Sequence, residues 1–451
     1  MDLVISIFRG IIGLTILVGI AFLISNNKKR INWKLVVNGL TLQLILAVFL
    51  IKGNTLEQWF SPLGWPKRFF EWISLGFVKI LDFSNAGASF LFGDLAKAVG
   101  VEGSMGAFFA FQVLPTIIFF ASFMSILYYL GIMQRIVQGM AWVMAKFMGT
   151  SGAESLSVTA DIFVGQTEAP LIIRPFLKGM TDSELLTIMT GGLATIAGGV
   201  MAAYIQMLGS TSAEILGVPL ETAKVIFASH LLCASVMAAP AALVLAKIII
   251  PETEEPETKG SVKIVIEKNG SNIAEAAANG ASDGLQLALN VGAMLIAFIA
   301  LVAMCNAGIQ YLGDLFGWNG YFISTFGQPL NLQLMFGLVL QFVAYGIGVP
   351  WHDSIHFGSL LGTKMVLNEF VAYSDFSKML QIKSITDVKT IVMATYALCG
   401  FANIGSIGIL IGGISPLAPN KKSTIAKLGV RALIAGTLAT LMTATLAGIL
   451  Y

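Results

Sequence analysis

The chain has 451 residues, of which 56% are hydrophobic and 12% charged, and its mean hydropathy is +0.82. Soluble domains carry about 25% charged residues, so the composition excludes a soluble enzyme of this size. The 27 Lys and Arg nearly balance the 25 Asp and Glu, which also excludes a disordered chain or a nucleic-acid-binding protein. We therefore expect an all-α, polytopic membrane protein. The three cysteines, Cys233, Cys305 and Cys399, lie far apart in apolar runs and predict neither a disulfide nor a metal site.

About eight stretches have the roughly 20 mostly apolar residues that a membrane-spanning helix needs. They are residues 3–25, 35–51, 106–130, 185–208, 223–250, 285–312, 390–417 and 428–451. The stretch 330–348 resembles a span but is short. Residues 53–104 hold two prolines and scattered charges, which predicts an interfacial or external helix rather than a span. The Glu-rich stretch 251–280 predicts a solvated loop.

Basic residues gather in two loops and predict the orientation of the chain. The first cluster is Lys28, Lys29, Arg30 and Lys34, and the second is Lys421, Lys422 and Lys427. Cytoplasmic loops are enriched in Lys and Arg, so both clusters are expected inside the cell. An even number of spans then places both termini outside.

Two segments are too polar for simple spans and too apolar for loops. They run from residue 151 to 175 and from 349 to 373, and each has a break of Gly, Pro and polar residues between two apolar halves. Irregular backbone at membrane depth must line a cavity or be buried in protein, as in re-entrant helical hairpins. Each is followed by a Gly-rich stretch with polar residues, 190–200 and 399–413. A hairpin followed by an interrupted helix, occurring twice, is typical of an inverted-repeat transporter.

Three motifs in these segments carry a resemblance to a known family. They are G-Q-T-E-A-P at 165–170, N-E-F-V-A-Y at 368–373 and G-F-A-N-I-G-S-I-G-I at 400–409. In this order they resemble the concentrative nucleoside transporter family. The resemblance implies a homotrimer whose protomers have a scaffold domain and a transport domain of two hairpins and two unwound helices. It also implies nucleoside uptake coupled to sodium or, as in some bacterial members, to protons.

The resemblance assigns eight residues to the substrate. Those matching the base-binding positions are Gln166, Thr167, Glu168 and Val200; those matching the ribose-binding positions are Glu369, Asn403 and Ser406, with Phe401 packing against the ligand. Simpler roles remain open from the residues alone. An intramembrane acid needs a partner, and Glu168 has Arg174 within six residues while Glu369 has Lys364 within five. Asn403 and Ser406 could instead bond neighbouring backbone in a Gly-broken helix.

The family's sodium site corresponds to Asp161, the Val164 carbonyl, the Thr195 hydroxyl and the Ile196 carbonyl. The chain departs from the family pattern at Asp161, where sodium-coupled members commonly carry Asn. Asp161 could bind sodium, take a proton as the coupling group, or be a hydrogen-bonded Asp at a helix end. The hydroxyl of Thr195 favours sodium over a proton.

The sequence thus predicts a secondary active symporter that imports nucleosides with sodium by alternating access. Proton coupling, or another polar solute on the same scaffold, is the alternative. G-x-S-x-G, H-E-x-x-H and Walker motifs are absent from the sequence, so we expect neither an enzyme nor a cofactor besides the coupling ion. The expected domains are N-terminal scaffold (1–147), first repeat (148–250), loop and scaffold spans (251–344) and second repeat (345–451). The short N-terminus resembles bacterial members, which implies the cytoplasmic (inner) membrane; purine or pyrimidine preference is not predicted.

Overall fold

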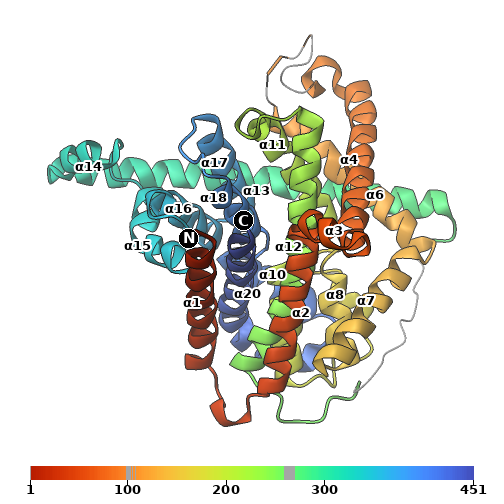
Figure 1. The fold of residues 1–451 in the computed structure, drawn as a ribbon. Helices are drawn as coiled ribbons and strands as arrows, with labels where there is room; N and C mark the ends of the chain where they lie inside the picture. The colour runs from red at the N-terminus through yellow and green to blue at the C-terminus, as the bar shows by residue number, and fades with distance from the viewer. Residues whose placement is uncertain (1, 98–102, 104, 107, 259–269) are drawn as a thin grey trace.

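The computed structural model describes residues 2–97, 103, 105, 106, 108–258 and 270–451, and the regular elements in them are helices (Figure 1). Within these residues, eight helices or helix pairs are long and apolar enough to cross a membrane. They are Ser6–Leu23, Trp33–Ile51, Ser61–Ala96, Phe109–Tyr129, Asp182–Gly209, Leu220–Ile249, Ile273–Leu315 and Pro419–Leu450. The all-α polytopic fold predicted from composition is confirmed.

The helices follow one another along the chain. Those of the first half are α1 (Asp2–Leu23), α2 (Trp33–Ile51), α3 (Gly53–Trp59), α4 (Trp65–Phe92), α5 (Phe109–Gln112), α6 (Leu114–Tyr129), α7 (Ile132–Met148), α8 (Gly152–Ala160), α9 (Ala169–Ile172), α10 (Asp182–Ala194), α11 (Gly198–Leu216) and α12 (Leu220–Ile249). Those of the second half are α13 (Ile273–Leu315), α14 (Trp318–Phe326), α15 (Leu332–Gly346), α16 (Trp351–Val366), α17 (Glu369–Gln381), α18 (Val388–Leu398), α19 (Ile404–Ile414) and α20 (Lys422–Leu450).

The sequence predicts the region 53–104 as an interfacial or external helix. Its described part, 53–97 and 103, differs from that prediction, and residues 98–102 and 104 lie outside the described residues. The structure makes Ser61–Ala96 a candidate span, most of it the 28-residue helix α4. Pro62 and Pro66 lie in the first turns of a 3₁₀ turn and of α4, where a missing N–H costs no helical hydrogen bond. The prolines therefore start these helices rather than break a span.

One span-like stretch and one predicted span also differ from expectation. The short stretch 330–348 is α15, which bends by 118° into α16 instead of crossing as a separate span. The stretch 390–417 is α18 and α19, two helices of 11 residues separated at Cys399–Asn403. The predicted and observed numbers of spans are both eight, but the sets differ: the observed set contains the region of α4 in place of the predicted span 390–417.

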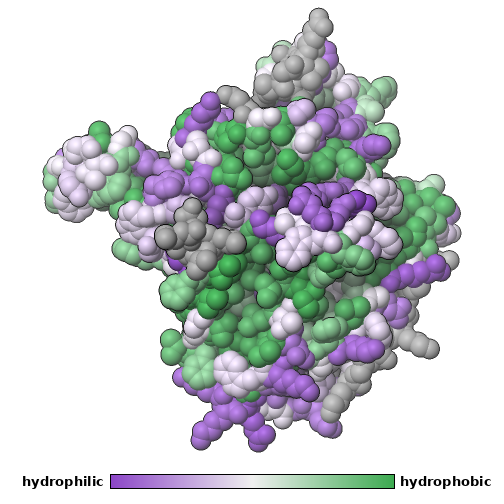
Figure 2. All heavy atoms as spheres, in the orientation of Figure 1, coloured by the Kyte–Doolittle hydropathy of each residue, from purple (hydrophilic) through white to green (hydrophobic). Residues whose placement is uncertain are grey.

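Helix α12 forms the centre of the molecule, and its apolar window is completely buried. Helices α2, α4, α10, α11 and α20 pack around it. The 43-residue α13 runs crosswise to α1, α2 and α20 in Figure 1 and packs along α6. Hydrophobic side chains cover much of the middle of the face in Figure 2, and hydrophilic ones gather at its lower end. This distribution is the one that a membrane protein needs.

Three connections meet at the lower end of the molecule in Figure 1. The Asn26 N–H donates to the Ile249 carbonyl at 3.1 Å, and the Asn420 amide donates to the Lys178 carbonyl at 3.0 Å. The two basic loops of the sequence and the end of α12 therefore lie on the same face. The chain termini lie near one another away from this face (Figure 1).

A buried ionic network joins the helix starts at this face. Lys247 forms ion pairs with Glu154 (2.8 Å) and Glu252 (3.3 Å). Glu154 and Glu184 complete capping boxes with Ser151 and Thr181 at the starts of α8 and α10. The Ser151 hydroxyl also donates to Glu184 at 2.6 Å, which ties the two starts together.

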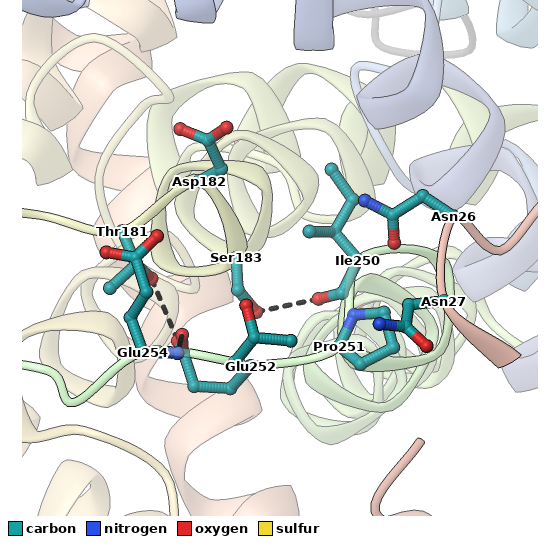
Figure 3. A pocket seen from close by; sticks show the side chains of 10 residues that line it. Asn26, Asn27, Thr181, Asp182, Ser183, Ile250, Pro251, Glu252 and Glu254 are labelled. Carbon is teal, nitrogen blue, oxygen red and sulfur yellow. Dashed lines mark hydrogen bonds between the residues drawn. The ribbon is translucent and has the colours of Figure 1, made fainter. Parts of the chain in front are cut away.

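A pocket of about 220 Å³ lies beside this network (Figure 3). Its wall comes from the loop after α1, the start of α10 and the segment that follows α12. Thr181 donates to Glu252 and Ser183 to the Ile250 carbonyl along that wall. The pocket lies at the helix ends and contains none of the residues assigned to substrate or ion.

Candidate substrate and ion site

Two broken helices meet at the centre of the site. The chain leaves helical geometry between α10 and α11 at Thr195–Ala197, and between α18 and α19 at Cys399–Asn403. The Phe401 N–H donates to the Thr195 carbonyl at 3.3 Å, so one break supplies a partner to the other. A Cβ added at Gly400 would lie 2.9 Å from the Leu193 carbonyl oxygen. Glycine at 400 is therefore needed for this close approach.

The first hairpin is less regular than its sequence predicts. Its first limb is α8, a turn covers residues 161–168, and the second limb has a single helical turn, α9, before further turns to residue 179. Pro170 lies at the start of α9, and Pro175 lacks the N–H that would extend it. The Phe163 carbonyl accepts from the Gly198 N–H at 3.1 Å. The hairpin tip is thereby joined to the start of α11.

The second hairpin is formed by α16 and α17, which turn at Leu367 and Asn368. The Asn368 side chain caps α17 by accepting from the Val371 N–H at 2.9 Å. Glu369 is therefore the first residue of α17, where the helix dipole favours a carboxylate. Lys364 does not pair with it: the ammonium donates to the Ala397 carbonyl at 2.8 Å and to Thr440 at 3.2 Å. The simpler reading of Glu369 as a partner of Lys364 is wrong.

Four of the residues assigned to the substrate form one polar cluster. Asn403 donates to the Glu369 carboxylate at 3.0 Å, and Gln166 donates to the Ser406 hydroxyl at 3.4 Å. Asn403 also accepts from the Ser406 N–H at 2.8 Å, so it caps α19 while holding Glu369. The simpler role considered for Asn403, a bond to neighbouring backbone, is present, and Asn403 bonds Glu369 in addition. The cluster joins the first hairpin, the second hairpin and the break before α19.

The other four assigned residues lie next to cluster residues in the chain or on α11. Among the described residues, Phe401 alone of the four bonds to the cluster: its carbonyl accepts from the Asn403 N–H at 2.8 Å. Val200 is buried on α11, and Phe401 is half-buried in the break. Thr167 lies against Gly413 of α19, where an added Cβ would approach its methyl carbon to 3.0 Å. Glu168 is exposed and accepts from the Gly165 N–H of its own turn. The structure gives it no ion pair with Arg174 among the described residues.

The residues assigned to the ion lie at the first hairpin turn and at the first helix break. Asp161 is 1% exposed, and neither carboxylate oxygen accepts a hydrogen bond from the described residues. A Cβ added at Gly191 would lie 3.0 Å from one of these oxygens, and the Thr195 hydroxyl donates to the Gly191 carbonyl at 2.9 Å. Asp161 and Thr195 are thus neighbours of the same glycine.

The two backbone ligands of the predicted ion set are also free. The carbonyl oxygens of Val164 and Ile196 accept no hydrogen bond from the described residues. A buried carboxylate without partners costs several kcal/mol, so Asp161 needs a cation or a proton. The reading of Asp161 as a merely hydrogen-bonded helix end does not hold.

Tyr204 is a residue of this region that the sequence reasoning missed. It is fully buried on α11, and its ring lies 4.9 Å from Phe370 and 4.1 Å from Tyr373. Its position four residues after Val200 places both on one face of the helix, a signal available in the sequence.

The fold contains two hairpins and two broken helices, and they bring polar groups together inside a helical membrane protein. This arrangement is that of a secondary transporter rather than an enzyme. Models of the Na+ dependent nucleoside transporter N-terminus and C-terminus match residues 12–95 and 230–448, and a nucleoside recognition model named Gate matches residues 110–211.

Relatives and solved structures agree with these models. The chain is 43% identical to an uncharacterized transporter of Haemophilus influenzae, over 98% of both chains. It is 40% identical to sodium/nucleoside cotransporter 1 of Rattus norvegicus, over 97% of this chain and 63% of that protein. The structure of CNTnw in an inward-facing substrate-bound state matches with a TM-score of 0.85 and 40% identity, covering 99% of this chain and 98% of that one. The protein belongs to the concentrative nucleoside transporter family.

Proposed function

We propose that this transporter imports nucleosides together with sodium by alternating access. The observation that carries the coupling is Asp161, a buried carboxylate with both oxygens unpaired beside the Thr195 break. The polar cluster of Gln166, Ser406, Asn403 and Glu369 supplies the substrate side. The family membership and the name of the rat relative, a sodium/nucleoside cotransporter, support both halves of the proposal.

The nucleoside is held between the two hairpins. A nucleobase edge offers donors and acceptors, which the amide of Gln166 and the hydroxyl of Thr167 complement, and Glu168 turns toward it from the same loop. The ribose hydroxyls donate to Glu369, whose carboxylate has lone pairs beyond the one that Asn403 uses. Ser406 completes the ribose contacts, while Val200 and Phe401 pack against the rings. Bound nucleoside thus bridges segments that the chain separates by more than 200 residues.

Sodium is held by oxygen atoms of the first hairpin and the first broken helix. Asp161 contributes a carboxylate, Thr195 its hydroxyl, and Val164 and Ile196 their free carbonyls. Binding neutralises Asp161 and draws the hairpin turn toward the α10–α11 break. Sodium therefore binds first and fixes the position of Gln166, five residues after Asp161, before the nucleoside binds.

Coupling to protons is the second candidate, and Asp161 is the observation that favours it. A carboxylic acid can carry the coupling proton, whereas the Asn of typical sodium-coupled members cannot. We rank sodium first because Thr195 and two free carbonyls add three neutral oxygens that a proton does not require. Either cation moving inward through about 100 mV supplies roughly 2.3 kcal/mol per charge.

The assembly and placement of the chain follow the family. We propose a homotrimer in the cytoplasmic membrane of a bacterium, with the basic loops at 28–34 and 421–427 inside and both termini outside. The mass of the protein in lipid nanodiscs tests the trimer. Cysteines introduced at Lys29 and at Lys422, labelled with an impermeant maleimide in a Cys305→Ser background, test the orientation; labelling from outside the cell would reverse it.

Uptake into proteoliposomes decides between the candidates. Labelled uridine and adenosine are offered while a sodium gradient and a proton gradient are imposed separately. Sodium-driven accumulation that a proton gradient does not replace supports the proposal. Accumulation driven by a proton gradient alone supports proton coupling. If neither gradient drives uptake of uridine or adenosine, both sodium coupling and proton coupling are rejected.

A further inference from the structure

Tyr204 differs from the other fully buried tyrosines of the described chain. The hydroxyl of Tyr373 donates to the Thr395 carbonyl at 2.8 Å, and the hydroxyl of Tyr396 lies 3.4 Å from His230 Nδ1. The hydroxyl of Tyr204 is buried and makes no hydrogen bond of standard geometry with the described residues. Buried polar groups are nearly always satisfied in native proteins, so an orphaned hydroxyl requires an explanation.

The surroundings of Tyr204 point toward the ribose side of the site. Its ring is fixed between Tyr373 and Phe370, and Phe370 directly follows Glu369 in α17. The hydroxyl interacts electrostatically with the Glu369 carboxylate, without a hydrogen bond of standard geometry. A tyrosine hydroxyl can donate one proton, and an ionised carboxylate accepts at about four positions. Within the described structure, Asn403 Nδ2 donates to one Glu369 side-chain oxygen, Oε2.

We infer that Tyr204 is a positioning residue for Glu369: in the loaded transporter its hydroxyl donates to the carboxylate and fixes the oxygen that receives a ribose hydroxyl. This inference rests on the proposed role of Glu369. The donor is built into α11, while its acceptor is on the second hairpin. Val200 lies on the same face of α11 one turn away, so one helix contributes to both the base and the ribose sides.

As a positioning residue for Glu369, Tyr204 contributes to specificity for ribose over deoxyribose. A site built to bond a hydroxyl discriminates strongly against analogues that lack it, provided that its own acceptor is held in place. Without the Tyr204 hydroxyl, Glu369 keeps Asn403 but can turn away from the sugar. The affinity for ribonucleosides then falls. The affinity for the deoxynucleoside that lacks the hydroxyl bound by Glu369 changes little, because that contact was never made.

The test compares Tyr204→Phe, Glu369→Gln, their double variant and Tyr373→Phe in proteoliposomes. The measured quantity is KM for uridine, 2′-deoxyuridine and 3′-deoxyuridine. We expect Tyr204→Phe to raise KM for uridine about tenfold, the effect of one charge-assisted hydrogen bond, and to leave one deoxy analogue nearly unchanged. Tyr373→Phe, which keeps both rings packed, is expected to preserve the ratio of uridine to deoxyuridine KM values.

The variants separate the possible failures. If Glu369→Gln leaves the uridine to deoxyuridine ratio unchanged, the ribose role of Glu369 is wrong and the inference falls with it. If Glu369→Gln makes the KM values for uridine and deoxyuridine equal while Tyr204→Phe leaves their ratio at the wild-type value, the inference alone is overturned. An equal rise in KM for all three nucleosides also overturns it, since that indicates a packing defect. In the double variant, a positioning role predicts no loss beyond that of Glu369→Gln, whereas a folding defect lowers uptake further.

Discussion

The Phe401 N–H donates to the Thr195 carbonyl, so the two broken helices hold each other at the level where each stops being helical. Thr195 is assigned to the ion and Phe401 to the nucleoside. One backbone hydrogen bond therefore joins the two proposed sites. If the ion binds at the first break as proposed, we expect any shift of Thr195 to be passed through this bond to Phe401.

The close approach of the breaks predicts a strong effect of Gly400→Ala. The added methyl group would lie 2.8 Å from Thr440 and 2.9 Å from the Leu193 carbonyl oxygen. Because backbone atoms cannot give way cheaply, we expect a loss of about 1–3 kcal/mol in stability and most of the uptake. Thermal unfolding in detergent and uridine uptake measure the two effects.

Gly408→Ala is the matched control for that substitution. Gly408 lies in α19, and an added Cβ would meet nothing within 4 Å. Alanine is the better helix former by about 1 kcal/mol, so the melting temperature should stay or rise. Equal losses in both variants would show that the effect comes from any alanine in this region and not from contact between the breaks.

The unpaired carboxylate predicts how substitutions of Asp161 behave. Asp161→Asn keeps a side-chain oxygen, so sodium-driven uptake should persist with a half-saturating sodium concentration raised about tenfold, as expected for a lost charge–charge contact. Asp161→Ala removes the ligand and should abolish sodium dependence. Uptake against varied sodium at fixed membrane potential gives both results. Complete loss of coupling in Asp161→Asn, with proton-driven uptake in the unmodified protein, would identify Asp161 as a proton carrier.

The polar cluster predicts that Glu369→Gln and Asn403→Ala weaken nucleoside binding in related ways. Asn403 both donates to Glu369 and caps α19, so its removal should cost about 1–2 kcal/mol in stability in addition to a rise in KM. Glu369→Gln should raise KM with little change in stability. Glu71→Gln, which affects a partly exposed pair with Lys67, serves as the control acid substitution. Wild-type KM values in both cluster variants would place the substrate elsewhere.

The ionic network at the lower face predicts a stability effect without a direct effect on substrate affinity. Lys247→Met leaves the buried Glu154 without its cation, which should cost about 3–5 kcal/mol. Lys378→Met removes an exposed lysine from its pair with the partly buried Asp375 and should cost less than about 1 kcal/mol. Thermal unfolding compares the two lysines. A similar small shift for both would mean that the Lys247 network is hydrated rather than sealed.

The class of fold could be predicted because charge is scarce in this chain, whereas the residues of the polar cluster were assigned by the resemblance to a known family. Glu369, Asn403 and Ser406 stand out among apolar neighbours, and the structure brings them together with Gln166. The bend between α15 and α16 and the length of α4 could not be predicted, since local hydropathy does not report the direction of a helix or the harmless position of a proline at its start.

The partners of buried charges were the least predictable feature. Lys364 lies five residues from Glu369 in sequence, yet it donates to the Ala397 carbonyl at the end of α18. That carbonyl is exposed by the break in the helix, which depends on tertiary packing. Tyr204 was missed for a similar reason: an aromatic residue on an apolar helix face resembles ordinary core, and only the orphaned hydroxyl distinguishes it.

The paired capping boxes at the lower face constrain how such a transporter can open. Ser151 and Thr181 start α8 and α10 side by side, and Lys247 ties that level to the end of α12. The base of the first hairpin is therefore held to α10 and α12, so the hairpin cannot rotate about its base independently of them. If these contacts stay intact while the nucleoside crosses the membrane, the hairpin, α10 and α12 must move together as one rigid group that carries the nucleoside with it.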